Sequence, residues 1–576
     1  MTRLYNDPTA FADEMIDGFA RASARWVQRV PGGVTRSTRS EPGTVALVIG
    51  GGSGHYPAFG GLVGPGLAHG AALGNLFASP SAQQVRHVSE AADLGGGILL
   101  SFGNYAGDVA NFGRARDELI ANGVACRIVT ITDDISSAPA SERHKRRGIA
   151  GDFTVFKCAG AAAERGDDLD DVERIARKAN DRTRSFGVAF SGCSLPGAAE
   201  PLFTVPEGRM AVGMGIHGEP GIDERDVPTA DELAELFVSS LLAELPDDIE
   251  DVRGARVAVI LNGLGSVKYE ELFVVYSGVA RRLDAAGIEV VEPEVGELVT
   301  SFDMAGASLT LFWLDDELEE LWRAPADAPA YSKGSVGPTV AADVWQADDE
   351  TVAIPEASEA SRSAALTVLA AIEALTTIVD EHADELGRID AVAGDGDHGI
   401  GMQRGSGAAL VAARDAVERG AGAGTVLALA ADAWSDRAGG TSGALWGAVL
   451  AALGDALADD AAPDRASVAA GVTAATTAVL GFGASPGDKT MVDAIVPFRD
   501  ALTAALDAGD SLAEAWSDAA DVTELAAAAT ADLLPRMGRA RPHAEKSLGT
   551  PDAGAVSFAL IVVAVGAVLR DAATDN

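Results

Sequence analysis

The stretch Thr44-Val-Ala-Leu-Val-Ile49-Gly50-Gly51-Gly52-Ser53-Gly54-His55 decides the fold of the first half of this chain. Six apolar or β-branched residues followed by glycines are typical of a strand that is buried on both faces and ends in a tight turn. The pattern returns at residues 97–102, which lead into Gly103-Asn104-Tyr105, and at residues 126–131, which lead into Thr132-Asp-Asp. Amphipathic stretches lie between these runs, so the sequence predicts an α/β domain with parallel or mixed sheets.

The rest of the chain divides into three parts. Further apolar runs at residues 256–261, 288–292 and 307–312 indicate a second α/β lobe within the first half. A Pro- and Gly-containing segment with few helix or strand signals follows. From residue 357 the chain is rich in alanine with helical periodicity, which predicts an all-α bundle or barrel. We therefore expect domains at 1–330 and 357–576, joined by a linker at 331–356.

Composition restricts the class of protein. The chain has 576 residues, 47% of them hydrophobic and 22% charged, which is typical of globular domains. Its formal charge of −41 disfavours nucleic acids and anionic membranes as partners. The three cysteines show no C-x-x-C spacing, so we expect buried free thiols. No signal peptide pattern is present and the longest apolar run, 556–569, is too short to span a bilayer, so we expect a cytoplasmic protein.

A carboxylate cluster lies in the helical half, in Asp390-Ala-Val-Ala-Gly-Asp395-Gly396-Asp397-His398-Gly399. Three carboxylates within eight residues repel one another, so a folded protein rarely places them together without a cation. Mg²⁺ fits because it takes oxygen ligands and is usually shared with substrate phosphates. A solvated acidic turn is the alternative, whereas a Ca²⁺ loop is disfavoured because the twelve-residue spacing with a terminal Glu is missing.

Three more segments of this half place glycine, hydroxyl or basic residues next to apolar runs. Small residues at a helix N-terminus make a phosphate site, and arginine can bind phosphate with two parallel hydrogen bonds. Each segment alone could equally be an ordinary loop. The segments are Ala438-Gly-Gly-Thr441-Ser442-Gly443, Gly483-Ala-Ser-Pro-Gly-Asp488-Lys489-Thr490-Met491, and Gly538-Arg539-Ala-Arg541 with the turn at 547–554.

Together these segments resemble the nucleotide domain of the two-domain, ATP-dependent dihydroxyacetone kinases, and the resemblance runs over nearly the whole chain. That family carries an Asp…Gly-Asp-Gly-Asp motif, a Gly-Gly-Ser-Ser-Gly-like loop and a Pro-Gly-Asp-Arg-Thr-Met element. The resemblance implies that residues 1–330 bind a ketose and that residues 357–576 bind ATP and Mg²⁺. It implies Asp390, Asp395 and Asp397 as metal ligands. The implied nucleotide-binding residues are Asp395, Gly396, Asp397, His398, Thr441, Ser442, Thr490, Met491, Gly538 and Arg539.

In the first half the resemblance gives the glycine-rich turn a ligand. Alone, the turn is weak evidence, and it is not a Walker motif because Gly-Lys-Ser/Thr is absent. In the family, Gly-Gly-Gly-Ser-Gly-His is the sugar loop and its histidine contacts the ketose hydroxyl. The turn at 104–108 matches the family's Asn-Tyr-Thr-Gly-Asp, in which the aspartate accepts or orients the proton of the reacting hydroxyl, although it could simply cap a helix. The implied ketose-binding residues are Gly52, Ser53, Gly54, His55, Tyr56, Gly103 and Asp108.

Met214-Gly-Ile-His217-Gly-Glu-Pro-Gly221 is the third element of the resemblance. A lone histidine between glycines is more often a turn residue than a nucleophile, but the octad matches the family's covalent-histidine motif. There a ring nitrogen adds to the ketone carbon as a hemiaminal, which positions the terminal hydroxyl and rejects polyols without a carbonyl. The implied catalytic residues are His217, His55 and Asp108, and the implied reaction is ATP + short ketose → ADP + ketose phosphate. The family also implies a homodimer in which the nucleotide domain covers a ketose lobe, that of a partner subunit.

Three other functions share these motifs. In phosphotransferase-system relatives a carrier protein rephosphorylates bound ADP, but the two domains usually lie on separate chains. Non-enzymatic regulators that bind the ketose or a transcription factor tend to lose catalytic residues, all of which are present here. A lyase-like formation of FMN from FAD would use the same site, and the sequence does not exclude it.

Two departures in the substrate loops bear on the sugar. Tyr56 stands where common family members have Glu, and Gly103 stands where they have Lys. Replacing a long cation by glycine opens volume, which an added hydroxymethyl group would fill, with the Tyr56 hydroxyl as a hydrogen-bond partner. The pattern resembles the erythrulose kinase branch of the family. We expect erythrulose as the substrate, with the D stereoisomer favoured, and dihydroxyacetone as the alternative.

Overall fold

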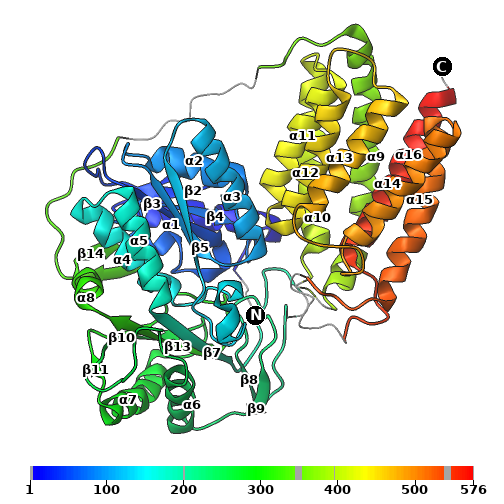
Figure 1. Cartoon of the computed structure of the whole chain (residues 1–576). Helices are drawn as coiled ribbons and strands as arrows, with labels where there is room; N and C mark the ends of the chain where they lie inside the picture. Colours follow the sequence, from blue (N-terminus) through cyan, green and yellow to red (C-terminus); the bar gives the residue numbers. More distant parts are fainter. Residues whose placement is uncertain are drawn as a thin grey trace. The chain divides into compact units, whose positions relative to one another are not determined.

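The computed structural model describes residues 4–198, 201–343, 353–392, 394, 396–537 and 546–574. The chain forms two compact units, Met1–Ala347 and Asp348–Asn576 (Figure 1). The first unit contains two β-sheets with helices, and the described part of the second unit is helical. The predicted fold class, an α/β domain of two lobes followed by an all-α domain, is confirmed.

The first sheet has a parallel centre and an antiparallel edge. Its order is β1-β2-β4-β3-β5-β6, in which β4, β3, β5 and β6 are parallel and β1 and β2 form the edge hairpin. The bounds are β1 Val27–Val30, β2 Gly33–Arg36, β3 Ala46–Gly52, β4 Gly70–Gly74, β5 Ile98–Gly103 and β6 Cys126–Ile131. Its two faces are covered by α1 Phe11–Ala22, α2 Ala82–Ala92, α3 Ala106–Ala121, α4 Asp152–Arg165 and α5 Leu169–Asp181. Strand β3 shows the alternation: Ala46 and Val48 pack with α2 and α3, whereas Leu47 and Ile49 pack in the cluster of α4 and α5.

The second sheet is mixed. Strand β10 lies between parallel neighbours β11 and β12 and antiparallel β13, and β7, β8 and β9 continue the sheet. One face packs against α6 and α7, while Ala258, Ile260 and Phe312 on the other face join the core of the first lobe. The two lobes therefore share one hydrophobic core. The bounds are β7 Thr183–Ala189, β8 Arg209–Val212, β9 Asp223–Asp226, β10 Arg256–Gly263, β11 Glu289–Val290, β12 Glu294–Gly296, β13 Gly306–Leu314, α6 Ala230–Leu242, α7 Tyr269–Ala286 and α8 Asp316–Arg323.

Two local predictions differ from the structure. The predicted strand at 44–49 does not stop before its glycines, because β3 runs through Gly52 and all three glycines are buried. A Cβ on Gly50 or Gly52 would overlap the backbone of Ala72 or Phe77, so close packing explains the glycines. Residues 331–333 of the predicted linker form strand β15 Tyr331–Lys333, which pairs with β14 Ala326–Ala328. Residues 344–352 of that linker lie outside the described residues.

The helical unit is a closed ring. Each helix packs against the next along the chain, and α16 packs against α9 to close the ring around one core. Neighbouring helices run in opposite directions, so the carboxyl ends of α9, α11, α13 and α15 lie at one end of the ring (Figure 1). The bounds are α9 Glu359–Asp390, α10 His398–Glu418, α11 Ala423–Ala438, α12 Gly440–Leu457, α13 Arg465–Leu480, α14 Val492–Ala508, α15 Leu512–Ala529 and α16 Ala553–Thr574.

Helices α9 and α16 are long and apolar enough to cross a membrane by length and composition alone. Each packs against the other and against further helices of the ring, which is the environment of core helices in a bundle. The predicted buried free thiols are confirmed for Cys126, Cys158 and Cys193.

Candidate active site

The predicted ketose residues follow strands of the first sheet. His55 follows β3 in a short 3₁₀ turn, Ser53–His55, and Asp108 lies in the first turn of α3, just after β5. In open α/β sheets, ligands bind at the carboxyl ends of parallel strands. The fold therefore brings together two loops that are about fifty residues apart in the sequence. The hydroxyl of Ser53 is buried and has no hydrogen-bond partner within the described part of the chain.

The two lobes meet at a pair of histidines. His55 belongs to the first lobe, whereas His217 lies between β8 and β9 of the second. Their Nε2 atoms are 2.9 Å apart, and both side chains are buried. His55 Nδ1 lies 2.7 Å from the backbone oxygen of Thr300, and His217 Nδ1 lies 3.2 Å from Glu219 Oε1. Both Nδ1 atoms therefore face acceptors, which requires each to carry a proton.

Aromatic rings enclose the His217 imidazole. Tyr105 lies across it at 4.5 Å between centroids, and Phe77 lies across it at 5.6 Å. The Phe77 backbone has φ of 57°, a left-handed conformation that bulky residues rarely adopt and that often marks functional sites. A Cβ on Gly54 would meet the Phe77 ring at 2.7 Å, so the glycines of the loop admit this ring. Aromatic rings therefore border both histidines.

Asp108 has buried acidic neighbours. Burial raises the pKa of Asp133 to about 6, while the N–H groups of Ile149 and Gly151 donate to its carboxylate. Burial, then Asp133 and Asp108, raises the pKa of Asp152 well above its usual range. Burial therefore favours the neutral forms of Asp133 and Asp152, the two carboxyl groups next to Asp108.

Gly103 and Tyr56, the two residues that depart from the family pattern, have surroundings that differ from those we expected. A Cβ on Gly103 would lie 3.1 Å from the Tyr105 ring, so Tyr105 already occupies part of the space that we expected glycine to open. The Tyr105 hydroxyl donates to the backbone oxygen of Gly148 at 2.9 Å, which fixes the ring there. The Tyr56 ring lies against Phe19 at 5.7 Å and is 44% exposed. The volume argument for a four-carbon sugar is therefore weaker than the sequence suggested.

At one end of the helical ring, His398 connects three of the predicted motifs. Its Nδ1 lies 3.3 Å from Ser442 Oγ at the start of α12, and its Nε2 lies 3.0 Å from Ser557 Oγ on α16. The His398 backbone N–H points to Asp390 Oδ2 at 3.4 Å. Burial lowers the pKa of His398, which favours the neutral ring and a connecting role. Thr441 lies beside Ser442 in the first turn of α12.

The acidic residues at this end crowd one another. Burial and the neighbouring Asp390 raise the pKa of Asp397 to about 7, and the same two causes raise the pKa of Asp552 to about 7. Oxygen donors alone and an excess of negative charge fit Mg²⁺ with phosphate oxygens as its remaining ligands. Within the described residues, no group of three His, Cys, Asp or Glu side chains is close enough to hold a cation by itself. Asp395, the central residue of the motif, lies outside the described residues.

A small cavity of ≈ 40 Å³ adjoins this acidic group. Lys489 lines this cavity, and its backbone is in a left-handed conformation with φ of 58°. Its ammonium donates to the backbone oxygens of Leu533 and Ser547 and to Ser547 Oγ, so it joins the loops before α14 and α16. The cavity is lined by Ile389, Asp390, Val392, Gly394, Lys489, Ser547, Thr550, Pro551, Asp552 and Ala553.

Some of the remaining predicted nucleotide-binding residues lie within the described part of the chain and others lie outside it. Thr490 and Met491 directly precede α14, where the Thr490 N–H donates to Asp493 at 2.9 Å. Gly396 stands next to Asp397 with φ of 75°. Gly538 and Arg539 lie outside the described residues. The sequence analysis did not single out Glu219, Phe77 or Asp552; it contained the segments Pro551-Asp552 and His217-Gly-Glu219, but not the contacts that these residues make with distant parts of the chain.

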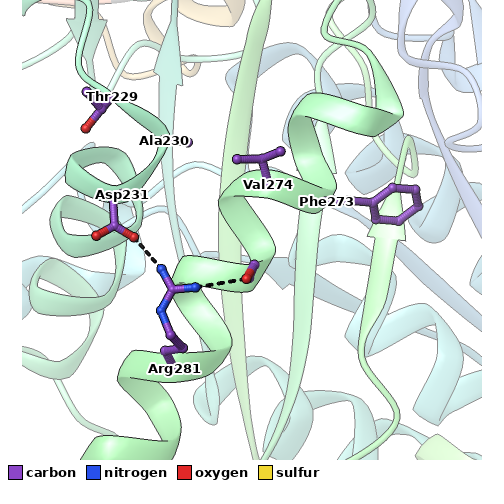
Figure 2. Close-up of a pocket in the computed structure, with 7 residues that line it drawn as sticks. Thr229, Ala230, Asp231, Phe273, Val274 and Arg281 are labelled. Atoms are coloured by element: carbon purple, nitrogen blue, oxygen red, sulfur yellow. Dashed lines mark hydrogen bonds and ion pairs between the residues drawn. The ribbon is translucent and has the colours of Figure 1, made fainter.

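A larger hollow of ≈ 560 Å³ lies elsewhere, between the start of α6 and the middle of α7 (Figure 2). Arg281 donates there to Asp231 at 2.6 Å and to Ser277 at 2.9 Å, and the rings and methyls of Phe273 and Val274 are exposed. None of the residues predicted for catalysis lines it.

Comparisons with known proteins show the family of this chain. A Dak1 domain model matches residues 17–330, and a DAK2 domain model matches residues 392–567. An L-erythrulose kinase of Pectobacterium atrosepticum is 62% identical over 100% of this chain and 98% of that protein. A D-erythrulose kinase of Mycolicibacterium smegmatis is 54% identical over 97% of each. The crystal structure of the dihydroxyacetone kinase from C. freundii with AMP-PNP and Mg²⁺ is 28% identical, with a TM-score of 0.52 over 98% of this chain and 99% of that one.

Proposed function

Since the chain belongs to the family of two-domain dihydroxyacetone kinases, we propose that it transfers the terminal phosphate of ATP to a hydroxyl of erythrulose. The similarity to erythrulose kinases covers the whole chain, so both the sugar half and the nucleotide half are represented. The observation that carries the chemistry is the contact between His55 and His217.

The hydrogen bonds of His55 and His217 determine how many protons the two imidazole rings carry. Each Nδ1 donates to an oxygen that can only accept, so two neutral rings would point two lone pairs at each other across 2.9 Å. One shared proton between the Nε2 atoms turns this contact into a hydrogen bond. Before the ketone binds, the two histidine rings therefore carry one positive charge together, and the Nε2 atom of one ring has a free lone pair.

This arrangement suits capture of a ketone. As the lone pair of His217 Nε2 forms a bond to the ketone carbon, the π pair of the C=O bond takes the proton from His55 Nε2. The product is a hemiaminal with a neutral hydroxyl, and the positive charge has moved from the His55 ring to the His217 ring. The tether then holds the terminal hydroxyl as in an intramolecular reaction. Polyols without a carbonyl cannot form it.

Phosphoryl transfer then uses the remaining groups. Asp108 accepts the proton of the tethered hydroxyl as it attacks the terminal phosphate. Asp390, Asp395 and Asp397 would hold Mg²⁺, which when bound supplies positive charge to the triphosphate. His398, Thr441, Ser442, Thr490 and Met491 would border the nucleotide, with Gly396, Gly538 and Arg539 completing the set. Gly52, Ser53, Gly54, Tyr56 and Gly103 would border the sugar.

The stereoisomer is the finer part of the proposal. The relative at 62% identity is named for L-erythrulose and the relative at 54% identity for D-erythrulose, so their names do not agree on the stereoisomer. Our preference for D-erythrulose stays a prediction that no residue of the structure decides. We further propose a cytoplasmic homodimer whose partners are ATP and the ketose, and not nucleic acid or membrane.

The purified full chain with Mg²⁺ and ATP, without any phosphocarrier protein, tests the proposal. We expect turnover of erythrulose and none of glycerol. The kcat/KM values for D-erythrulose, L-erythrulose and dihydroxyacetone then rank the substrates, and one carbon of fit is worth about 10–200-fold. A clear preference for dihydroxyacetone would reject erythrulose as the substrate. Dependence on a phosphocarrier, ketose binding without turnover, or FMN release from FAD as the main activity would each reject the kinase proposal.

A further inference from the structure

We propose that Glu219, held by Arg147, is a positioning residue that fixes the reactive tautomer of His217 and stabilises the charge created on its ring by ketone capture. The inference deepens the proposed function and rests on it.

Glu219 binds His217 at two points. Its Oε1 accepts from the ring Nδ1 at 3.2 Å, and its Oε2 accepts from the His217 backbone N–H at 3.0 Å. A proton on Nδ1 leaves Nε2 with the lone pair that the addition needs. An acceptor at Nδ1 therefore selects which nitrogen reacts, and the second contact fixes the carboxylate against the backbone of the same residue.

The local sequence builds this geometry. The Gly215 N–H donates to the Glu219 backbone oxygen at 2.9 Å, and the Gly218 N–H donates to the Gly215 oxygen at 3.1 Å, so residues 215–219 form a closed turn. Gly218 has φ of 82°, and a Cβ there would overlap the Phe203 ring. A Cβ on Gly215 would overlap both Glu219 Oε2 and Arg147 Nη1. The glycines let the turn fold the carboxylate back onto the histidine.

Arg147 fixes the far side of the carboxylate. Its Nη1 lies 3.6 Å from Glu219 Oε2, while its Nε and Nη2 donate to Asp134 Oδ2 at 3.2 and 2.9 Å. Asp134 in turn accepts from the N–H and hydroxyl of Ser136. Asp134, Arg147 and Glu219 have side chains between 2% and 14% exposed, so water competes little with these contacts.

Charge movement gives Glu219 a function beyond packing. Before capture, the shared proton places one positive charge on the pair of rings. After the N–C bond forms, the His217 ring is substituted at Nε2 and protonated at Nδ1, so the whole charge lies on the ring that touches Glu219. A carboxylate next to a buried cation stabilises it strongly, and its removal leaves an unpaired charge. Loss of Glu219 should therefore weaken the adduct more than it weakens the empty protein.

Carbon-13 NMR with ketose labelled at the carbonyl carbon measures this step directly, because the ketone carbon becomes tetrahedral in the hemiaminal. We expect Glu219→Gln to lower adduct occupancy at least about tenfold, since a free-energy loss of about 1.4 kcal/mol already gives a factor of ten. Glu219→Asp, which keeps the charge, should lose less. Glu224→Gln on β9 removes a carboxylate that pairs with Arg209 outside this site and serves as the matched control.

Gly215→Ala gives a second, independent variant. It removes no charge and no hydrogen-bonding side chain, yet its methyl group displaces Glu219 and Arg147. We expect a loss of adduct and a higher KM for the ketose, with the KM for ATP unchanged. Arg147→Met should lower occupancy, and Arg147→Lys should restore part of it, which keeps the test valid if Glu219→Gln does not fold.

The alkaline limit of the adduct gives a further readout. The groups that face His217 are His55, Tyr105 and Glu219, with Arg147 and Asp134 behind them. Burial raises the pKa of Tyr105 well above its usual range, so its phenol stays neutral across the experiment. Without the Glu219 charge, the shared proton of the histidine pair should be lost at lower pH, and the alkaline limb of adduct formation should move down.

The possible outcomes distinguish the role of Glu219 from the covalent tether on which it rests. No tetrahedral carbon in the wild-type protein would reject the covalent tether itself. A tetrahedral carbon in wild type with equal occupancy and equal alkaline limb in folded Glu219→Gln, or in both Arg147 variants, would reject only the role of Glu219. Reduced occupancy in the Glu219 and Arg147→Met variants, but not in Glu224→Gln, supports it.

Discussion

The proposed sugar site and the proposed nucleotide site of this chain are built in opposite ways. Around His217 the charged groups have buried partners: the Nε2 atoms of His55 and His217 lie 2.9 Å apart, Glu219 contacts a histidine ring and an arginine, and Arg147 contacts two carboxylates. Around Asp390 the neighbouring carboxylates remain crowded, and burial raises the pKa of both Asp397 and Asp552 to about 7. The first site is preorganised for chemistry by its own residues. In the second, the proposed Mg²⁺ and phosphate would balance the charge of the carboxylates.

This difference predicts that each site can be destroyed without the other. His217→Ala should lower turnover by about 10⁴-fold or more, because it removes the positioning that the tether provides, while nucleotide binding persists. Asp397→Ala should abolish phosphoryl transfer and leave the tetrahedral ketose signal in carbon-13 NMR unchanged. Asp395→Ala should behave alike.

Asp500→Ala is the control in the same unit, because Asp500 forms an exposed ion pair with Arg499 on α14. An Asp397→Ala protein that binds nucleotide but no longer captures the ketose would overturn the assignment of the two units.

A second prediction divides the chemistry within the sugar site. Asp108→Asn should keep the tether, since capture uses the histidine pair, but lose the acceptor for the hydroxyl proton. General-base loss of this kind costs about 10²- to 10⁴-fold in kcat, with little change in adduct occupancy. Single-turnover kinetics beside carbon-13 NMR separates the two steps. Equal loss of adduct and kcat would mean that Asp108 acts in capture instead.

Tyr105 allows a smaller test of how the sugar pocket is bounded. Tyr105→Phe removes the hydroxyl that donates to the Gly148 oxygen and so releases the ring that lies on His217 and beside Gly103. One hydrogen bond of about 1 kcal/mol corresponds to roughly fivefold. We expect a loss of that size in kcat/KM, larger for the sugar that fits less well. An unchanged ratio between erythrulose and dihydroxyacetone would show that Tyr105 does not select the sugar.

The sequence predicted what depends on local pattern. Apolar runs located β3, β5, β6, β10 and β13, and alanine periodicity located the helical half. Short strands with polar residues, such as β1 and β9, were missed because edge strands need not be apolar. The roles of His55, His217 and the Asp motif came from resemblance. Contacts such as His55 with Thr300, 245 residues apart, depend on tertiary packing that no local pattern encodes.

Two buried lysines, one in each unit, allow the same comparison at single side chains, with the smallest expected effect. Lys157 in α4 is fully buried, and its ammonium donates to one backbone oxygen, that of Leu321, at 2.7 Å. Lys489 in the helical unit donates to three oxygens and lies near Asp552 and Asp532. Methionine has a similar volume to lysine, so a Lys→Met change at each position compares a poorly solvated charge with a well solvated one.

Burial lowers the pKa of Lys157 to about 8, below its unfolded value of about 10.4. The unfolded chain therefore binds more protons between these values, so wild-type stability rises with pH from about 8 to about 10.4 and the penalty is fully present at pH 7. Lys157→Met should raise the free energy of unfolding at pH 7 by about 1 kcal/mol, after the Leu321 oxygen loses its donor. This gain should shrink and disappear as the pH rises from about 8 toward 10.4, because the wild-type penalty falls over that range. Lys489→Met should instead destabilise by about 2 kcal/mol, because three acceptors lose their donor. Urea unfolding of the full chain at pH 7 and pH 10 measures both. A gain for Lys489→Met, or a pH-independent effect for Lys157→Met, would show that the two charges are solvated alike.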